Sequence, residues 1–163
     1  MRKITAAIVL FVTMFVVAGC SSIDCSLNSL VLSQYSFVTP DNKPDTLHDT
    51  LTITTNTVYG DTVLLNRAIN ITEFSLPVSY SLDRDTLFFN FTSKDGRKAT
   101  DRIIMKKTNI SHFESVDCPP TFFHNVEEIE HQGTIIDSVR VNDKEITNET
   151  TNKNIFIYLK SGI

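Results

Sequence analysis

Alternation of apolar and polar residues is the dominant pattern along this chain. It is almost strict between residues 47 and 58, where Leu47, Leu51 and Ile53 fall on one side and threonines on the other. Successive side chains of a strand point to opposite faces, so this segment predicts a half-buried strand. Further runs rich in β-branched and aromatic residues predict strands at 30–38, 62–65, 74–80, 86–92, 100–107, 111–116, 122–130, 135–141 and 155–159.

Turn signals separate the predicted strands. Residues 39–44 contain two prolines with Asp and Asn, and residues 94–97 contain an Asp-Gly pair that tolerates positive φ and favours a tight hairpin. Residues 122–131 also suit a short helix, because three glutamates fall within them. About ten short strands separated by turns predict an all-β fold. We expect a single antiparallel β-sandwich with immunoglobulin-like packing.

The first twenty residues have a different composition. Met1, Arg2 and Lys3 precede an apolar run over residues 4–18, which has the proportions of an export signal. A transmembrane helix needs roughly 20 apolar residues. The run ends in Val-Ala-Gly-Cys at residues 17–20, which resembles the lipobox of bacterial lipoproteins. The resemblance implies that Cys20 receives a diacylglyceryl group and becomes the first residue of the mature chain.

This organisation divides the chain into three parts. We expect a signal peptide over 1–19, a lipidated tether over 20–28 and one β-sandwich domain over 29–163. Only four residues separate Cys20 from Cys25, a span of at most about 17 Å. Cys25 and Cys118 are the two remaining cysteines, and two cysteines in an exported domain most often form a disulfide. Two separate buried thiols are the alternative.

Charge excludes one class of partner. The formal net charge is −4 and becomes −6 when Arg2 and Lys3 leave with the signal peptide. Such a surface repels nucleic acid, which we do not expect as a partner. Residues 94–107 are nevertheless basic, with six Lys and Arg against Asp95 and Asp101. This segment would suit anionic lipid head groups or an anionic glycan, or it is a solvated face with internal ion pairs.

Motifs for catalysis are missing from the sequence. It contains no G-x-S-x-G, H-E-x-x-H, C-x-x-C or glycine-rich phosphate loop. We therefore predict no catalytic residue, metal or cofactor. Strand spacing would place His112 beside Glu114, and His124 beside Glu128 and Glu130, in sets that zinc accepts. We interpret them instead as surface histidines on a sheet that is polar on one face. The side-chain oxygens of Asp41, Asn42 and Asp45 could ligate calcium. We interpret these residues instead as an ordinary turn, because Asp, Asn and Pro together are typical of turns.

Two classes of function are consistent with these features. The first is a non-enzymatic binding or assembly module in the cell envelope, whose partners would be the membrane, through the lipid, and an unidentified envelope protein or glycan. The second is an envelope hydrolase whose site is assembled from dispersed residues such as His112, Glu114 and His124. A pocket that gathers these three residues would favour the hydrolase.

A short repeated pattern predicts possible modification. Asp-[Ser/Thr]-aliphatic occurs five times, which exceeds the roughly one match that composition predicts, and it resembles the O-glycosylation site of exported Bacteroidota proteins. The same pattern begins many strands, because Asp favours turns and Thr favours strands. The candidate hydroxyls, in order of expected accessibility, belong to Thr46, Thr62, Thr86, Thr50 and Ser138.

Four stretches of the chain resemble a family of small uncharacterised lipoproteins from gut Bacteroidota. They are residues 20–25, 63–67, 74–80 and 112–118. The resemblance implies an envelope location, the second and third cysteines and a β fold, and it implies no activity. Cell-surface lipoproteins of that phylum carry an acidic run after the lipidated cysteine, whereas only Asp24 is present here. We therefore expect the periplasmic face of the outer membrane.

Overall fold

The computed structural model describes residues 30–57, 60–113, 115 and 118–160 of the 163-residue chain. The segments predicted as signal peptide and tether, with Cys20 and Cys25, lie outside the described residues. The described part is all-β and contains ten strands: β1 (Leu32–Phe37), β2 (Thr50–Thr57), β3 (Gly60–Ala68), β4 (Glu73–Pro77), β5 (Arg84–Thr92), β6 (Lys98–His112), β7 (Thr121–Gln132), β8 (Ile136–Val141), β9 (Glu145–Ile146) and β10 (Ile155–Leu159).

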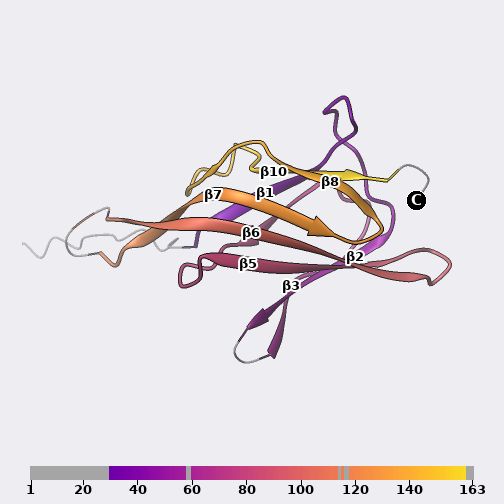
Figure 1. The fold of residues 1–163 in the computed structure, drawn as a ribbon, viewed down its shortest axis with the longest axis horizontal. Coiled ribbons are helices and arrows are strands. Elements are labelled where there is room, and N and C mark those ends of the chain that lie inside the picture. The colour runs from indigo at the N-terminus through magenta and orange to yellow at the C-terminus, as the bar shows by residue number, and fades with distance from the viewer. Residues whose placement is uncertain (1–29, 58–59, 114, 116–117, 161–163) are drawn as a thin grey trace, which may run out of the picture.

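Two sheets pack against each other, which confirms the predicted β-sandwich (Figure 1). One sheet has the order β4-β1-β10-β8 and the other the order β3-β2-β5-β6-β7-β9. One pair departs from the antiparallel pattern, since β1 and β10 run parallel with Tyr35 opposite Ile155. Pairs that are not joined by a tight turn are free to take either direction, and these two strands lie at opposite ends of the chain.

The core lies between the facing sheets and follows the predicted alternation. Leu47, Leu51 and Ile53 are each at most 3% exposed. The ring of Phe74, on β4, meets the ring of Phe89, on β5, edge to face at 6.1 Å. Burial of these apolar side chains against one another is the main stabilising contribution to the sandwich.

Strand β6 differs from its prediction because it is continuous. The sequence predicts separate strands at 100–107 and 111–116, but β6 continues through residues 108–110, which pair with Asn125, His124 and Phe123 of β7. Residues 122–131 form strand rather than helix, because they pair with β6 along its length. Strand β9 has only two residues, so it is too short to produce an alternating pattern, and the sequence did not predict it.

The length of β6 defines two ends of the molecule. Its 15 residues span about 45 Å. The hairpin end carries the β5–β6 turn and the C-terminal end of β1. The N-terminal end carries the start of the described chain, the β6–β7 connection and the loop between β4 and β5 (Figure 1). Val31 packs there against Val78, and Val78 N–H donates to the Val31 carbonyl at 3.4 Å.

The described part of the chain holds no helix of the length and apolarity needed to span a bilayer.

Candidate binding site

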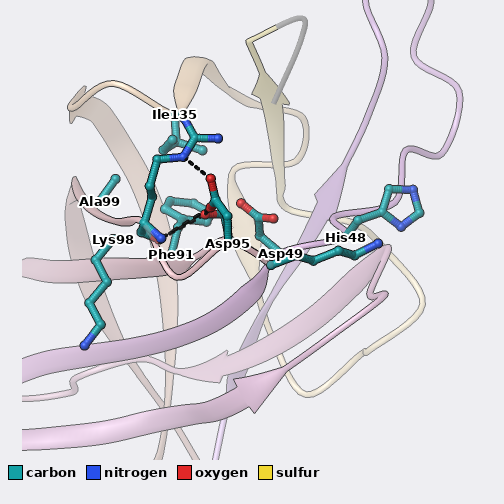
Figure 2. A pocket seen from close by; sticks show the side chains of 10 residues that line it. His48, Asp49, Phe91, Asp95, Lys98, Ala99 and Ile135 are labelled. Atoms are coloured by element: carbon teal, nitrogen blue, oxygen red, sulfur yellow. Dashed lines mark hydrogen bonds and ion pairs between the residues drawn. The ribbon is translucent and has the colours of Figure 1, made fainter.

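A cavity of about 650 Å³ opens at the hairpin end of the sandwich. Three segments far apart in sequence form its walls: residues 48–49 before β2, the β5–β6 hairpin, and Ile135 before β8. Figure 2 shows side chains from all three segments around one opening. Ligand pockets commonly measure about 300–1,000 Å³, so the cavity is large enough for a small ligand.

The cavity combines apolar side chains with a charged rim. Phe91, Ala99 and Ile135 contribute the apolar surface. Figure 2 shows Lys98 extending away from the carboxylates of Asp49 and Asp95. An apolar surface with a few polar groups is typical of sites that orient a small molecule. The polar rim is formed by His48, Asp49, Ser93, Lys94, Asp95, Arg97 and Lys98.

The two rim carboxylates are held differently. Asp95 accepts a hydrogen bond from Ser93 Oγ, and its Oδ2 lies 2.6 Å from Arg97 Nε. The Ser93 hydrogen bond first, and then Arg97, lower the pKa of Asp95 to about 2. The Asp49 side chain has no hydrogen bond or ion pair to any residue that the structure describes, so it is available to a ligand.

The predicted hairpin turn is confirmed and shapes this rim. Gly96 has φ +85°, a conformation that glycine adopts without strain. Gly96 N–H donates to the Ser93 carbonyl at 3.0 Å, and Ser93 N–H donates to the Arg97 carbonyl at 2.9 Å. The tight turn therefore brings the Asp95 and Arg97 side chains together.

A buried carboxylate fixes the wall that Ile135 provides. Asp101, on β6, is fully buried and accepts backbone hydrogen bonds from Thr134, Ile135 and Ile136 at 2.8, 2.8 and 2.6 Å. Gly133, in the same turn, has φ +150°, and a Cβ there would lie 2.0 Å from Asp101 Cγ. Only glycine lets the β7–β8 turn approach β6 this closely.

The basic segment 94–107 is not one continuous patch. Lys107 is only 2% exposed, and Lys106 pairs with Glu127 at 3.3 Å. Arg102 donates a hydrogen bond to Gln132. Half of the basic residues are therefore engaged along β6, and the other three belong to the cavity rim: Lys94, Arg97 and Lys98.

The histidines proposed for a hydrolase are not brought together. His124 pairs with Asn109 in the β6–β7 ladder, whereas His112 pairs with Thr121, three residues further along. An odd offset between two residues of a strand places them on opposite faces. His112 is exposed and stacks on Phe123 with ring centroids 4.5 Å apart. Glu114 lies outside the described residues.

The predicted grouping of His124 with Glu128 and Glu130 is wrong because of a β-bulge. Lys106 pairs with Glu128 and Lys107 with Val126, so the ladder skips one residue of β7. A bulge inverts the alternation beyond it. His124 therefore faces inward, while Glu128 and Glu130 are exposed.

The turn considered for calcium is occupied by contacts within the protein. Asn42 Oδ1 accepts hydrogen bonds from Arg140 and Tyr158 at 2.9 and 2.8 Å. Asp45 Oδ1 accepts the N–H of Thr46 at 2.8 Å. Among the described residues, no three His, Cys, Asp or Glu side chains are grouped so that they could hold a metal ion.

The candidate glycosylation sites differ in accessibility. Thr62, on β3, is exposed, whereas the other four are partly buried. Thr46 lines a second hollow of about 290 Å³ that shares His48, Asp49 and Ile135 with the cavity. Thr62 is therefore the position best placed to carry a glycan, and modification of these sites stays a prediction.

Cys118, in the β6–β7 connection, is disulfide-bonded. Cys25, its predicted partner, lies outside the described residues. The pairing of these two cysteines stays a prediction.

A polar network near the N-terminal end of the sandwich is one feature that sequence reasoning missed. Lys107 Nζ donates to the carbonyl of Ser79 at 2.7 Å and to the carbonyl of Leu82, and lies 3.5 Å from Asp85 Oδ2. Burial lowers the pKa of Lys107, and the Asp85 carboxylate opposes this change. Asn109 Oδ1 joins the network to His124 Nδ1 at 2.7 Å. The network holds the β4–β5 loop against β6.

His124 predicts a pH dependence of stability. Burial, and then the charge of Lys107, lower its pKa from 6.5 to about 4. Between these values the unfolded chain binds a proton that the folded chain does not, so the free energy of unfolding falls as the pH falls from 6.5 towards 4. The loss should approach about 3 kcal/mol.

Urea unfolding at several pH values measures this effect. The control is His124→Gln, which keeps a hydrogen-bonding group near Asn109 and cannot titrate. The difference in free energy of unfolding between the two proteins should narrow as the pH falls. Parallel pH profiles for the two proteins would rule out this role for His124.

Sequence reasoning also missed most of the cavity. The charged rim residues of the β5–β6 hairpin belong to the basic segment that composition singled out, but nothing local marks His48, Asp49 or Ile135. These residues meet only because Asp101 ties the β7–β8 turn to β6 and because β2 pairs with β5.

Comparison with known proteins identifies one family. Residues 50–159 match the model of a family of unknown function (DUF6452), which is well over half of the chain. No curated protein and no solved structure matches the chain. The matched region ends with β10 and omits β1, although β1 pairs with both β4 and β10. The folded unit is therefore larger than the matched region.

Proposed function

The chain belongs to a family of unknown function (DUF6452), and we propose that this member is a non-enzymatic binding module of the bacterial cell envelope. In this proposal the lipid on Cys20 holds the domain at the outer membrane, on its periplasmic face. The cavity at the hairpin end binds the ligand. The observation that carries the proposal is the cavity itself, with its apolar surface and its available Asp49 carboxylate.

The position of the cavity supports this arrangement. It opens at the hairpin end, whereas the start of the described chain and the β6–β7 connection lie at the N-terminal end (Figure 1). The two ends are separated by the length of β6, about 45 Å. A short tether at the N-terminal end would hold that end beside the membrane and leave the cavity facing away from it.

The dimensions and chemistry of the cavity favour a glycan as the ligand. A protein partner commonly buries about 800 Å² on each side of an interface, whereas a cavity of about 650 Å³ suits one small group. The Asp49 carboxylate can accept hydrogen bonds from sugar hydroxyls. Lys94 and Lys98 can donate to ring or carboxylate oxygens, and Phe91 and Ile135 can pack against the apolar face of a sugar ring.

A binding role is better supported than the hydrolase alternative. That alternative required His112 and His124 to meet, and the two side chains project from opposite faces of the β6–β7 ladder. His124 is also enclosed, with 3% of its surface exposed, and is hydrogen-bonded to Asn109.

Site-specific photo-crosslinking in the native host tests the cavity. A photoreactive amino acid at Lys98, on the rim, should give an adduct whose added mass is that of a glycan. The same amino acid at Arg84 serves as the control, because Arg84 is an exposed basic residue near the other end of the same strand pair. Mass spectrometry of the purified protein reads out the adduct.

A cavity-filling change provides the second control. Ile135→Trp keeps the backbone N–H that Asp101 binds but occupies the opening, so the Lys98 adduct should be largely lost. An adduct that forms equally at Lys98 and Arg84, or that survives Ile135→Trp, would show that the cavity is not the binding site.

A further inference from the structure

Exposed apolar side chains gather at the N-terminal end of the domain. Each is at least half exposed, and they come from the start of the described chain, the β4–β5 loop and the end of β6: Leu30, Tyr80, Leu82, Ile110 and Phe113. We call this group the apolar end. The two other large apolar residues exposed to this degree in the described part, Val63 and Ile69, lie on or beside β3.

The apolar end is held in place by contacts within the fold. Tyr80 stacks on Phe122 with ring centroids 5.3 Å apart. Phe122 pairs with Ser111 in the β6–β7 ladder, whereas Ile110 pairs with Phe123 and therefore projects from the other face at the same end. Leu82 is fixed through its carbonyl, which accepts hydrogen bonds from Lys107 Nζ and from Asn109 Nδ2. Tyr80, Leu82 and Ile110 therefore hold defined positions at this end of the sandwich.

The composition of the apolar end is typical of a surface that contacts a membrane. Clustered exposed apolar residues mark an interaction site, since leaving each one in water costs free energy. Aromatic rings with a polar edge, such as that of Tyr80, favour the boundary between lipid and water. Phe113, Ile110 and Leu82 supply the apolar part that would reach the acyl chains.

The length of the preceding chain identifies what covers this surface. Ten residue steps lead from Cys20 to Leu30, a distance of at most about 36 Å. Leu30 is itself a member of the apolar end. A lipid attached at Cys20 would therefore keep the apolar end within reach of the bilayer, while the charged cavity rim would lie about 45 Å further away.

We propose that the apolar end inserts its side chains into the interfacial layer of the membrane that carries the Cys20 lipid. This proposal rests on the lipid anchor of the proposed function, and it adds a defined orientation: apolar end on the bilayer, cavity directed away from it. The surface acts as a second membrane contact beside the acyl chains.

The chain contains no tryptophan, so a single introduced one reports its own environment. The test uses the full lipidated protein with Phe113→Trp, in neutral phosphatidylcholine vesicles, with and without lipids brominated on their acyl chains. The matched control is Ile69→Trp, which also lies at an exposed apolar position. Ile69 follows Ala68, and Ala68 lies at the hairpin end because it pairs with Leu51, which pairs with Phe91, which in turn pairs with Ala99. Flotation of the protein with vesicles measures the lipid anchor independently of the fluorescence at position 113.

We expect vesicles to shift the emission of Trp at position 113 to shorter wavelength and brominated lipids to quench it, with neither effect at position 69. Protein that floats with vesicles while position 113 stays unquenched would keep the anchor and overturn the membrane contact. Emission already shifted without lipid would assign the surface to a second copy or to another segment of the chain, and would also overturn it. Protein that neither floats nor is quenched would overturn both proposals.

Discussion

Replacing Asp101 by alanine is expected to lower the free energy of unfolding by about 4 kcal/mol. The fully buried carboxylate accepts three backbone hydrogen bonds from the β7–β8 turn, at residues 134–136. Hydrogen bonds to a charged acceptor are the stronger kind, and alanine would leave all three N–H groups without this acceptor. Alanine also removes the carboxylate atoms against which Gly133 packs, and so leaves a gap between the turn and β6.

Urea unfolding followed by circular dichroism measures the effect at pH 7. Asp137→Ala is the matched control, because Asp137 is an exposed aspartate on the neighbouring strand β8 and its loss should cost less than about 0.5 kcal/mol. Asp101→Asn should fall between the two, since its amide oxygen can accept some of the hydrogen bonds while its NH₂ group opposes the rest. An Asp101→Ala protein as stable as the Asp137→Ala control would show that the turn is held by other contacts.

The proposed lipid anchor predicts that replacing Cys20 by serine abolishes lipid attachment completely. In the proposal the diacylglyceryl group is joined to Cys20 through a thioether, which a serine hydroxyl cannot form. The signal peptide would then stay on the chain, because its removal follows lipid attachment in proteins with a lipobox. The variant should therefore be found as a precursor that is larger than the mature protein by residues 1–19 and carries no acyl chain.

Labelling with palmitate in the native host, followed by intact-mass analysis, measures both changes. Cys118→Ser is the control cysteine substitution, because it removes a disulfide-bonded cysteine outside the lipobox-like segment and should leave palmitate incorporation intact. Intact-mass analysis of the unsubstituted protein would also reveal any glycan at Thr62 or the other candidate hydroxyls. Normal palmitate incorporation into Cys20→Ser would remove the basis for placing the domain at a membrane.

Local pattern was sufficient for the β-sandwich. The alternation of Leu47, Leu51 and Ile53 placed these residues in the core, and their exposure of at most 3% agrees. The Asp-Gly pair correctly predicted the β5–β6 hairpin, since a tight turn depends on the φ preferences of its own residues. Signals of this kind can be read from neighbouring residues alone.

A β-bulge in β7 made the predicted grouping of His124 with Glu128 and Glu130 wrong. The period of two correctly predicts strand at 122–130, but the bulge opposite Lys106 and Lys107 inverts the side-chain direction after it. A bulge depends on how two strands fit together, so the sequence of β7 by itself does not mark it. This is why His124 and Glu128 were predicted on one face and lie on two.

The amino-acid sequence by itself determined the alternating strands, their turns and the lipobox-like start, because each depends on residues adjacent in the chain. Only the tertiary structure decided the parallel pairing of β1 with β10, the cavity beside the hairpin and the apolar end. Asp49, Lys98 and Ile135 are remote in sequence but line one cavity, because β2 pairs with β5, β5 pairs with β6, and Asp101 binds a turn more than thirty residues away. Contacts over such separations depend on packing and on the satisfaction of buried polar groups, which no local pattern records.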